Sequence, residues 1–300
     1  MKILFVSLGC DKNLVDSEVM IGLLGKKGFS FTDDETEADV IVINTCCFIN
    51  DAKEESINTI LEMAEYRKSG SCKALIVAGC LAQRYKQEIV DEIPEVDAVL
   101  GTTTYDAIVE TVEKVLEGQK ELHFEDIDRL VPEQEGARAL TTGGHYAYLK
   151  IAEGCDKHCT YCIIPYTRGR VRSRKIEDIE AEAKRLAVGG YKEIVLTGIH
   201  LDSYGVDLEN ENLLDVIRRI AAIDGIERIR LGSLEPRIMT EEFVEGLASV
   251  KELCPHFHLS MQSGCDETLK RMNRKYDTEE FLACCDRLRA YFDEPALTTD

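Results

Sequence analysis

The 300-residue chain lacks any apolar stretch long enough to cross a membrane, and its basic residues are far outnumbered by acidic ones. Met1 leads directly into an apolar, β-prone segment, without the cationic and long apolar regions of a secretion signal. Lys and Arg number 36 against 56 Asp and Glu, which gives a formal charge of −20. This charge disfavours nonspecific binding to nucleic acid or to anionic membranes. We therefore expect a cytoplasmic protein in which any contact with RNA uses a local basic patch.

One run of residues is the best candidate for such a patch. Five cations occur in eight residues between Arg168 and Lys175, in the sequence RGRVRSRK. Short basic runs are also common on solvated loops at the start of helices, so this second interpretation stays open.

Strand and helix patterns alternate along the first 115 residues. Continuous apolar runs are typical of strands that are covered on both faces, and the segments between them have helical spacing. The predicted strands are 2–7, 39–44, 74–78 and 98–101, and the predicted helices are 16–26, 52–68, 84–92 and 105–116. This order predicts an α/β domain with a doubly wound parallel sheet. The turn after the first strand is SLGCDKN instead of GxGxxG, so a dinucleotide site is not expected there.

Three of these predicted strands are each followed by a cysteine. The strand ends are SLGC with Cys10, NTC with Cys46 and AGC with Cys80. Because ligands of parallel sheets collect at the carboxyl ends of the strands, three separate loops can bring these thiols to one place. The pattern favours a three-thiolate metal cluster, although single cysteines at strand ends also serve as small buried fillers. Cys47 and Cys72 lack this placement and are interpreted as packing or surface residues.

A polar, irregular segment precedes a second β/α series. We predict a first domain at 1–120, a linker at 121–144 and a second domain at 145–300, with a partial (β/α) barrel in the last. The last predicted strand begins at Ala296 and the chain stops at Asp300, so we expect the sequence to be a fragment of a longer protein. The predicted strands of the second domain are 148–152, 193–197, 229–232, 256–261 and one from 296, and its predicted helices lie near 176–188, 212–222, 240–249 and 277–293.

The first loop of the second domain carries three cysteines at CxxxCxxC spacing. Cys155, Cys159 and Cys162 follow a predicted strand directly. Three thiolates leave one iron of a 4Fe-4S cluster without a protein ligand, and S-adenosylmethionine is the small molecule that we expect to bind and be activated there. Zinc is the alternative, with His158 as a fourth ligand, but zinc sites usually pair CxxC knuckles and His158 is expected to point outward.

Five segments carry a resemblance to a known family. They are SLGCDKNLVDSE (7–18), VINTCCFINDAKEES (42–56), AGCLAQRY (78–85), YLKIAEGCDKHCTYCIIPYTRGRVRSR (148–174) and LSMQSGCDETLKRMNRKY (259–276). With them the chain resembles the radical S-adenosylmethionine methylthiotransferases over its whole length. The N-terminal half is most similar to the members that modify an aspartate of a small-subunit ribosomal protein. The C-terminal half is more similar to those that modify threonylcarbamoyl-adenosine in the tRNA anticodon loop.

The resemblance implies two 4Fe-4S clusters and S-adenosylmethionine as cofactors. One cluster would lie on Cys155, Cys159 and Cys162, and an auxiliary cluster on the three strand-end cysteines. A 5′-deoxyadenosyl radical would abstract a hydrogen from an unactivated C–H position, and a methylated sulfur would be delivered to that carbon. The family also implies an electron donor such as flavodoxin or ferredoxin, and a C-terminal substrate-binding β-barrel that is absent here. We therefore expect cluster binding to survive better than turnover.

Four residues are predicted to line the S-adenosylmethionine pocket. Ser233 and Glu235 end one strand of the barrel, Gln262 ends the next, and Tyr161 is an aromatic wall beside the cluster. Glu235 is the best acceptor for the ribose or the ammonium group, and packing at the barrel rim is the alternative role for these residues. No catalytic acid or base is assigned from the sequence. A non-enzymatic iron-sulfur protein is a remote alternative, because redox carriers normally close the cluster with a fourth ligand.

Overall fold

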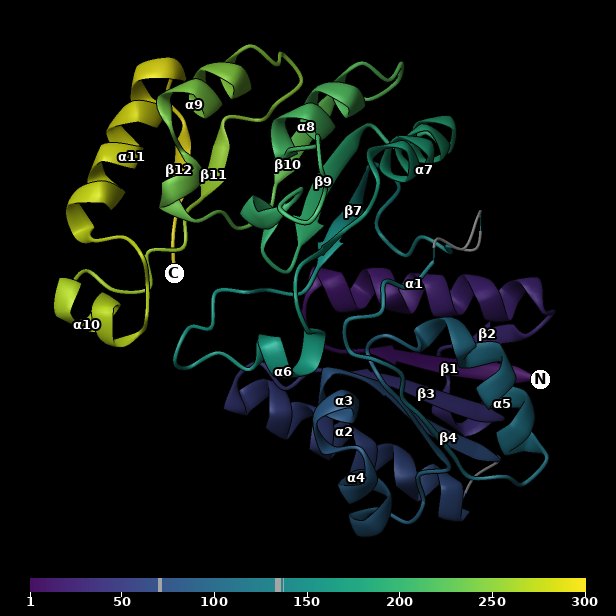
Figure 1. Cartoon of the computed structure of the whole chain (residues 1–300). Helices are drawn as coiled ribbons and strands as arrows, with labels where there is room; N and C mark the ends of the chain where they lie inside the picture. The colour runs from purple at the N-terminus through teal and green to yellow at the C-terminus, as the bar shows by residue number, and fades with distance from the viewer. Residues whose placement is uncertain (70–71, 133–135, 137) are drawn as a thin grey trace. The chain divides into compact units, whose positions relative to one another are not determined.

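The computed structural model describes residues 1–69, 72–132, 136 and 138–300 of the chain. It consists of two compact units, which are drawn together in Figure 1. The first unit comprises Met1–Thr141 and Ile163–Gly169, and the second comprises Thr142–Cys162 and Arg170–Asp300. A short segment that follows the CxxxCxxC loop in the chain therefore belongs to the first unit.

The first unit is built on a six-stranded parallel sheet of order β2-β1-β3-β4-β5-β6. Its two longest central strands are buried at every position, as their continuous apolar sequences predict. The strands are β1 (Lys2–Ser7), β2 (Ser30–Thr32), β3 (Val40–Thr45), β4 (Ala74–Gly79), β5 (Ala98–Leu100) and β6 (Glu121–His123).

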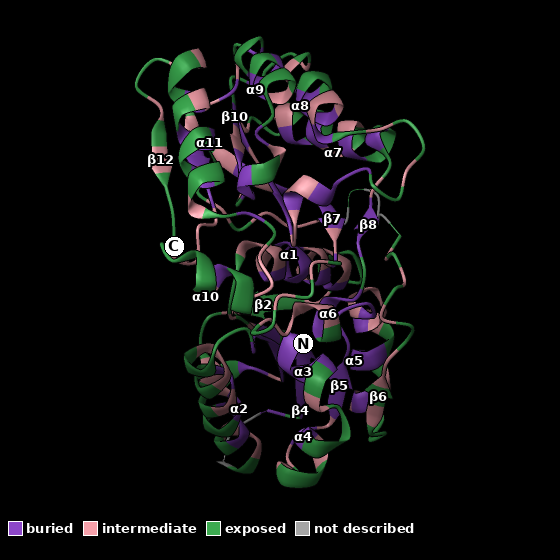
Figure 2. Cartoon of the chain, turned by 60° about the vertical axis from the view of Figure 1, so that its left-hand side comes forward, coloured by how far each residue is buried: buried purple, intermediate pink, exposed green. Residues whose placement is uncertain are grey.

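Helices cover both faces of this sheet. Successive side chains of a strand point to opposite faces, so Ile41 and Ile43 pack in one apolar core and Val40 and Val42 in another. In Figure 2, β4 and β5 are buried, whereas α2 and α4 expose much of their outer surface. The predicted doubly wound α/β architecture is confirmed. The helices are α1 (Asp11–Lys26), α2 (Asn50–Ser69), α3 (Cys80–Tyr85), α4 (Gln87–Glu92), α5 (Ile108–Leu116) and α6 (Ile164–Arg168), with 3-10 turns η1 (Glu35–Glu37) and η2 (Tyr105–Ala107).

The structure differs from the sequence prediction at the sheet edges and at helix ends. Strands β2 and β6 are missing from the prediction, because each is three residues long and largely polar. Strand β6 occupies the start of the segment predicted as a linker, and 133–135 and 137 of that segment lie outside the described residues. Helix α1 begins at Asp11, five residues earlier than predicted. The helix predicted at 84–92 is two helices, separated at Lys86, which has a φ of +40°.

The second unit has a β/α alternation around a curved set of strands. Strands β10, β9 and β7 are parallel neighbours, and the short β8 pairs antiparallel with β7. Strands β11 and β12 form a parallel pair, and isolated parallel bridges join Ile229 to Leu253 and Leu234 to Leu259. The strands are β7 (Tyr146–Glu153), β8 (Arg172–Ser173), β9 (Glu193–Gly198), β10 (Arg228–Leu231), β11 (His256–His258) and β12 (Ala296–Thr298).

The helices of the second unit bury apolar stripes. Leu213, Val216, Ile217 and Ile220 of α8 recur at helical spacing and are at most 2% exposed. Helix α10, absent from the prediction, follows β11. No helix in the described part of the chain has the length and apolar character that crossing a membrane requires. The helices are α7 (Ile176–Val188), α8 (Leu213–Ala221), α9 (Glu241–Ala248), α10 (Asp266–Arg271) and α11 (Thr278–Tyr291), with 3-10 turns η3 (Leu201–Ser203) and η4 (Pro236–Ile238).

Candidate metal centres

Cys10, Cys46 and Cys80 lie at one edge of the first unit. They follow β1, β3 and β4, which are adjacent parallel strands, so the three loops meet at the carboxyl ends of those strands. Cys46 and Cys80 are buried, at 7% and 8% exposure, and Cys10 is exposed where it caps α1. The structure therefore brings together the three cysteines that the strand ends indicate.

Two glycines allow these loops to approach one another. Gly9 has a φ of +90°, and a Cβ there would lie 2.8 Å from Cβ and 3.1 Å from Sγ of Cys46. Gly79 has a φ of +93°, and a Cβ there would lie 2.5 Å from the backbone oxygen of Thr45. A side chain at either position would clash and would strain the backbone, so glycine is required to place the cysteines that follow.

The thiols in this group influence one another electrostatically. Burial raises the pKa of Cys46, and the nearby Cys10 raises it further. Burial also raises the pKa of Cys80 to about 11, whereas the adjacent Arg168 cation acts to lower it. Metal ligation requires thiolates, and a cation beside a buried sulfur favours that form. Cys47 and Cys72 are buried in the apolar core of this unit, which confirms their interpretation as packing residues.

The second group of cysteines lies in the loop that follows β7. Cys155, Cys159 and Cys162 are each partly buried. Burial raises the pKa of Cys155 to about 11, and the two other thiols add to the effect. His158 is exposed and has a φ of +48°, so its side chain is directed to solvent, as predicted.

The turn after α10 holds this cysteine loop. The Thr160 N–H donates to the oxygen of Met272 over 3.1 Å, and the Asn273 side-chain amide donates to the oxygen of His158 over 3.0 Å. Arg274 Nη1 donates to Cys159 Sγ over 3.3 Å. These contacts join the cysteine loop to residues 272–274 of the segment 259–276.

Three potential metal ligands converge near Glu235. His200, Asp202 and Glu235 each offer one atom, and these atoms all lie within 4.8 Å of one another. Each cysteine triad offers three thiols, whereas a structural zinc site normally has four protein ligands. Three thiolates can hold three irons of a cubic 4Fe-4S cluster and leave the fourth iron open, so the donor chemistry of each triad fits such a cluster.

Three of the four residues predicted to contact S-adenosylmethionine are hydrogen-bonded or ion-paired. The Tyr161 hydroxyl donates to Gln262 Oε1 over 2.9 Å. Glu235, only 5% exposed, lies 3.1 Å from Lys157 Nζ and 3.4 Å from Arg274 Nη2. Ser233 is exposed, two residues before Glu235.

Further polar groups surround Glu235 that the sequence did not identify. Its N–H donates to Asp202 Oδ2 over 2.6 Å. Burial raises the pKa of Asp202 to about 7, and the charge of Glu235 adds to this. Burial lowers the pKa of His200 to about 4, together with the Lys157 cation. Lys157 lies in the segment 148–174 and Arg274 in the segment 259–276, both of which carry the family resemblance. Their place in these segments is the sequence signal that could have identified them.

The predicted basic patch is not present on the surface. Arg168 is 1% exposed and Arg172 is 8% exposed. Arg174 is partly buried and lies 2.6 Å from Glu182 Oε2. Within this run only Arg170 and Lys175 are exposed. The prediction of an RNA-binding patch is wrong, because most of these cations are engaged by the protein itself.

Two family models match the chain. Residues 2–101 match an uncharacterized protein family, UPF0004, and residues 149–300 match the radical SAM superfamily. The solved structures of TsrM, a radical S-adenosylmethionine methyltransferase from Kitasatospora setae, and of OxsB, a cobalamin-dependent radical enzyme, are similar in fold. The TsrM structure matches with a TM-score of 0.62 at 14% sequence identity and covers 99% of this chain and 66% of its own. The OxsB structure matches with a TM-score of 0.61 at 13% identity and covers 99% of this chain and 48% of its own.

The chain is also similar to two enzymes across both of its halves. It is 55% identical over 300 residues to the ribosomal protein uS12 methylthiotransferase RimO of Lachnoclostridium phytofermentans, a match that covers 100% of this chain and 68% of that protein. The RimO of Acetivibrio thermocellus is 47% identical over 305 residues, a match that covers 99% of this chain and 67% of that protein. The chain thus spans about two thirds of the length of these curated relatives. The predicted family is confirmed: the chain belongs to the RimO-type methylthiotransferases of the radical SAM superfamily.

Proposed function

We propose that this protein adds a methylthio group to an aspartate of the small-subunit ribosomal protein uS12. The observation that carries the proposal is similarity over the whole chain to enzymes named for this reaction, in a chain with a cysteine triad in each unit. The C-terminal half resembles tRNA-modifying enzymes in its motifs, but the matches to the two RimO enzymes extend over this half as well.

The cofactors divide between the two units. Membership of the radical SAM superfamily implies S-adenosylmethionine and a 4Fe-4S cluster. In our proposal Cys155, Cys159 and Cys162 hold this cluster and leave one iron open for S-adenosylmethionine. A second 4Fe-4S cluster, the auxiliary cluster, is held by Cys10, Cys46 and Cys80. The shared strand edge and the electrostatic coupling of these three thiols support that assignment.

When bound, the two 4Fe-4S clusters and S-adenosylmethionine would supply the one-electron chemistry and the sulfur that the reaction needs. An unactivated C–H bond has no useful acidity for a general base to exploit, so the reaction needs no general base at that carbon. The chain's own residues bind and orient. S-adenosylmethionine would be contacted by Tyr161, Ser233, Glu235 and Gln262, of which Tyr161 and Gln262 are hydrogen-bonded to each other. Lys157 and Arg274 hold the Glu235 carboxylate in place.

The electrostatics of the chain support a protein substrate over tRNA. A formal charge of −20 repels a phosphate backbone, and the run that would have formed a basic patch is largely buried. The alternative substrate, threonylcarbamoyl-adenosine of the tRNA anticodon loop, rests on the motifs of the C-terminal half. A flavodoxin or ferredoxin is the proposed electron donor.

Cluster content and S-adenosylmethionine cleavage test this proposal against a non-enzymatic iron-sulfur protein. The chain is reconstituted anaerobically, iron and sulfide are counted, and S-adenosylmethionine is added with dithionite. We expect about eight iron atoms per chain and reductive cleavage of S-adenosylmethionine. Iron without any cleavage would favour a redox or storage protein and would contradict the proposal.

A further inference from the structure

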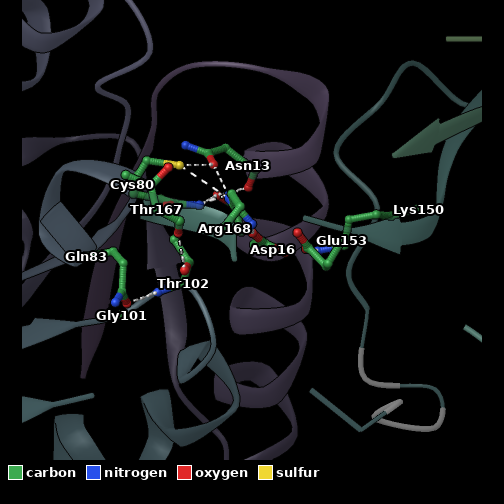
Figure 3. Close-up of polar contacts among 12 residues, drawn as sticks. Asn13, Asp16, Cys80, Gln83, Gly101, Thr102, Lys150, Glu153, Thr167 and Arg168 are labelled. Carbon is green, nitrogen blue, oxygen red and sulfur yellow. Dashed lines mark hydrogen bonds and ion pairs between the residues drawn. The ribbon is translucent and has the colours of Figure 1, made fainter. Parts of the chain in front are cut away.

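Arg168 is a fully buried cation that contacts one of the candidate cluster ligands. It is among the largest side chains in the described part of the chain with less than 2% exposure. Nη1 lies 2.7 Å from Asp16 Oδ2, Nη2 donates to Asn13 Oδ1, and Nε lies 3.3 Å from Cys80 Sγ. Figure 3 shows the guanidinium between these three side chains. One side of Arg168 is therefore fixed by an anion and an amide, and the other faces a sulfur.

The helix that carries Arg168 is itself anchored beside the cysteine. Helix α6 packs on α3, which begins at Cys80. The Thr102 hydroxyl donates to the backbone oxygen of Thr167 over 2.6 Å, and the Thr102 N–H donates to Gln83 Oε1 over 3.1 Å. Because Gln83 and Cys80 belong to the same helix, these bonds fix α6 relative to the Cys80 thiol (Figure 3).

Asn13 links Arg168 to the other two cysteine loops. Its amide nitrogen donates to the oxygen of Leu8 over 3.0 Å and to the oxygen of Thr45 over 2.9 Å. Leu8 precedes Cys10 by two residues, and Thr45 directly precedes Cys46. With its amide nitrogen used in this way, the Asn13 oxygen is left to accept from Arg168. One asparagine and one arginine thus bind to the loops of all three cysteines.

We propose that Arg168, held by Asp16 and Asn13, is a positioning residue of the auxiliary cluster. The inference rests on the proposed function, in which Cys10, Cys46 and Cys80 carry that cluster. The Nε–H of Arg168 fixes the position of the Cys80 sulfur, and the positive charge would stabilise the anionic cluster beside this buried thiolate. Outer contacts of this kind affect how tightly the metal is held, and their loss typically costs 10- to 100-fold in metal affinity. Because they also stabilise the more negative, reduced cluster, they raise its reduction potential.

The test uses the chain with Cys155, Cys159 and Cys162 changed to Ala, so that only the auxiliary cluster is observed. Arg168→Met and Arg168→Lys are made in this background. Arg67→Met is the matched control, since Arg67 makes a bidentate pair with Asp97 elsewhere in the same unit. After anaerobic reconstitution, the iron released to a chelator and the midpoint potential of the cluster are measured.

We expect Arg168→Met to hold iron about 10- to 100-fold less tightly, so that it releases iron to the chelator faster, and to have a lower midpoint potential. Arg168→Lys, which keeps a cation beside Asp16 and therefore folds if Arg168→Met does not, should recover most of the potential but still release iron faster than the background. Arg67→Met should match the background in both. Release and potential unchanged in Arg168→Lys and Arg168→Met would overturn the inference while leaving the proposed cluster in place. A background that binds no iron would instead overturn the auxiliary cluster itself, and the inference with it.

Discussion

Arg168 and Asp16 are 152 residues apart in the chain, yet their side chains form a buried ion pair with 2.7 Å between Nη1 and Oδ2. The two side chains are 1% and 4% exposed. The pair joins α6 to α1 inside the first unit. Because both charges are removed from water, each depends on the other for compensation.

Removing one member of this pair should strongly destabilise the first unit. We predict that Arg168→Met lowers the free energy of unfolding by about 3–5 kcal/mol, because Asp16 is then a buried charge without its cation. The double variant Asp16→Asn with Arg168→Met should recover part of this loss. Urea unfolding of the metal-free chain, followed by circular dichroism, measures both. The Arg67–Asp97 pair is more exposed, so Arg67→Met should lower the free energy of unfolding by about 1 kcal/mol or less. Equal losses of stability in Arg67→Met and Arg168→Met would contradict the prediction.

The two cysteine triads should bind iron independently. Changing Cys155, Cys159 and Cys162 together to Ala should remove about half of the iron, and changing Cys10, Cys46 and Cys80 should remove the other half. Cys72→Ala is the control, because Cys72 is a buried packing residue. Iron and sulfide analysis after anaerobic reconstitution gives the result. A full iron complement in either triple variant would show that its cysteines are not the ligands.

The carboxylate of Glu235 should contribute to the binding of S-adenosylmethionine. A hydrogen bond to a charged group is worth about 1.5–3 kcal/mol, so Glu235→Gln should weaken binding by about 10-fold or more. Glu241→Gln is a suitable control, since Glu241 is a surface carboxylate paired with Arg287 on another part of the same unit. Equilibrium binding to the reconstituted chain measures the change. Equal affinity in wild type and Glu235→Gln would remove Glu235 from the pocket.

Asp202 should make the stability of the chain depend on pH. Burial raises its pKa from 3.8 to about 7, so the folded state holds its proton more tightly than the unfolded state. Stability therefore falls as pH rises from about 4 to about 7. Asp202→Asn has no charge to bury and should be more stable than wild type above pH 7, by at most about 4 kcal/mol.

Thermal unfolding of the metal-free chain at pH 4, 6 and 8 tests this dependence. The advantage of Asp202→Asn should shrink toward pH 4, where the wild-type carboxyl is protonated in both states. Burial lowers the pKa of His200 to about 4, so His200 makes the folded chain less stable as the pH falls from 6.5. This effect is present in both proteins and does not change the difference between them. A constant difference between the two proteins across this range would mean that folding does not raise the pKa of Asp202.

Local sequence patterns predicted the sheet core and the cysteines, but not the contacts around them. Strands such as Val40–Thr45 are apolar throughout, and the cysteines follow strand ends whose parallel order fixes a common edge. The burial of Arg168 could not be predicted in this way, because its partners Asp16 and Asn13 lie far away in the sequence. The same reason explains why Arg274 was not connected to Cys159, which is 115 residues earlier. Charged residues in a basic run carry no local signal that distinguishes a buried ion pair from a surface patch.

Mass spectrometry of the modified product is the most direct test of the proposed function. The chain, extended by the part of the L. phytofermentans relative that it does not span, is expressed in cells lacking their own uS12 methylthiotransferase. Ribosomal protein uS12 and total tRNA are then digested and analysed from the same culture, with the Cys155→Ala variant as the control. We predict a methylthio group on an aspartate of uS12, absent in the control, and none on threonylcarbamoyl-adenosine. A methylthio group found only on the tRNA nucleoside would contradict the account.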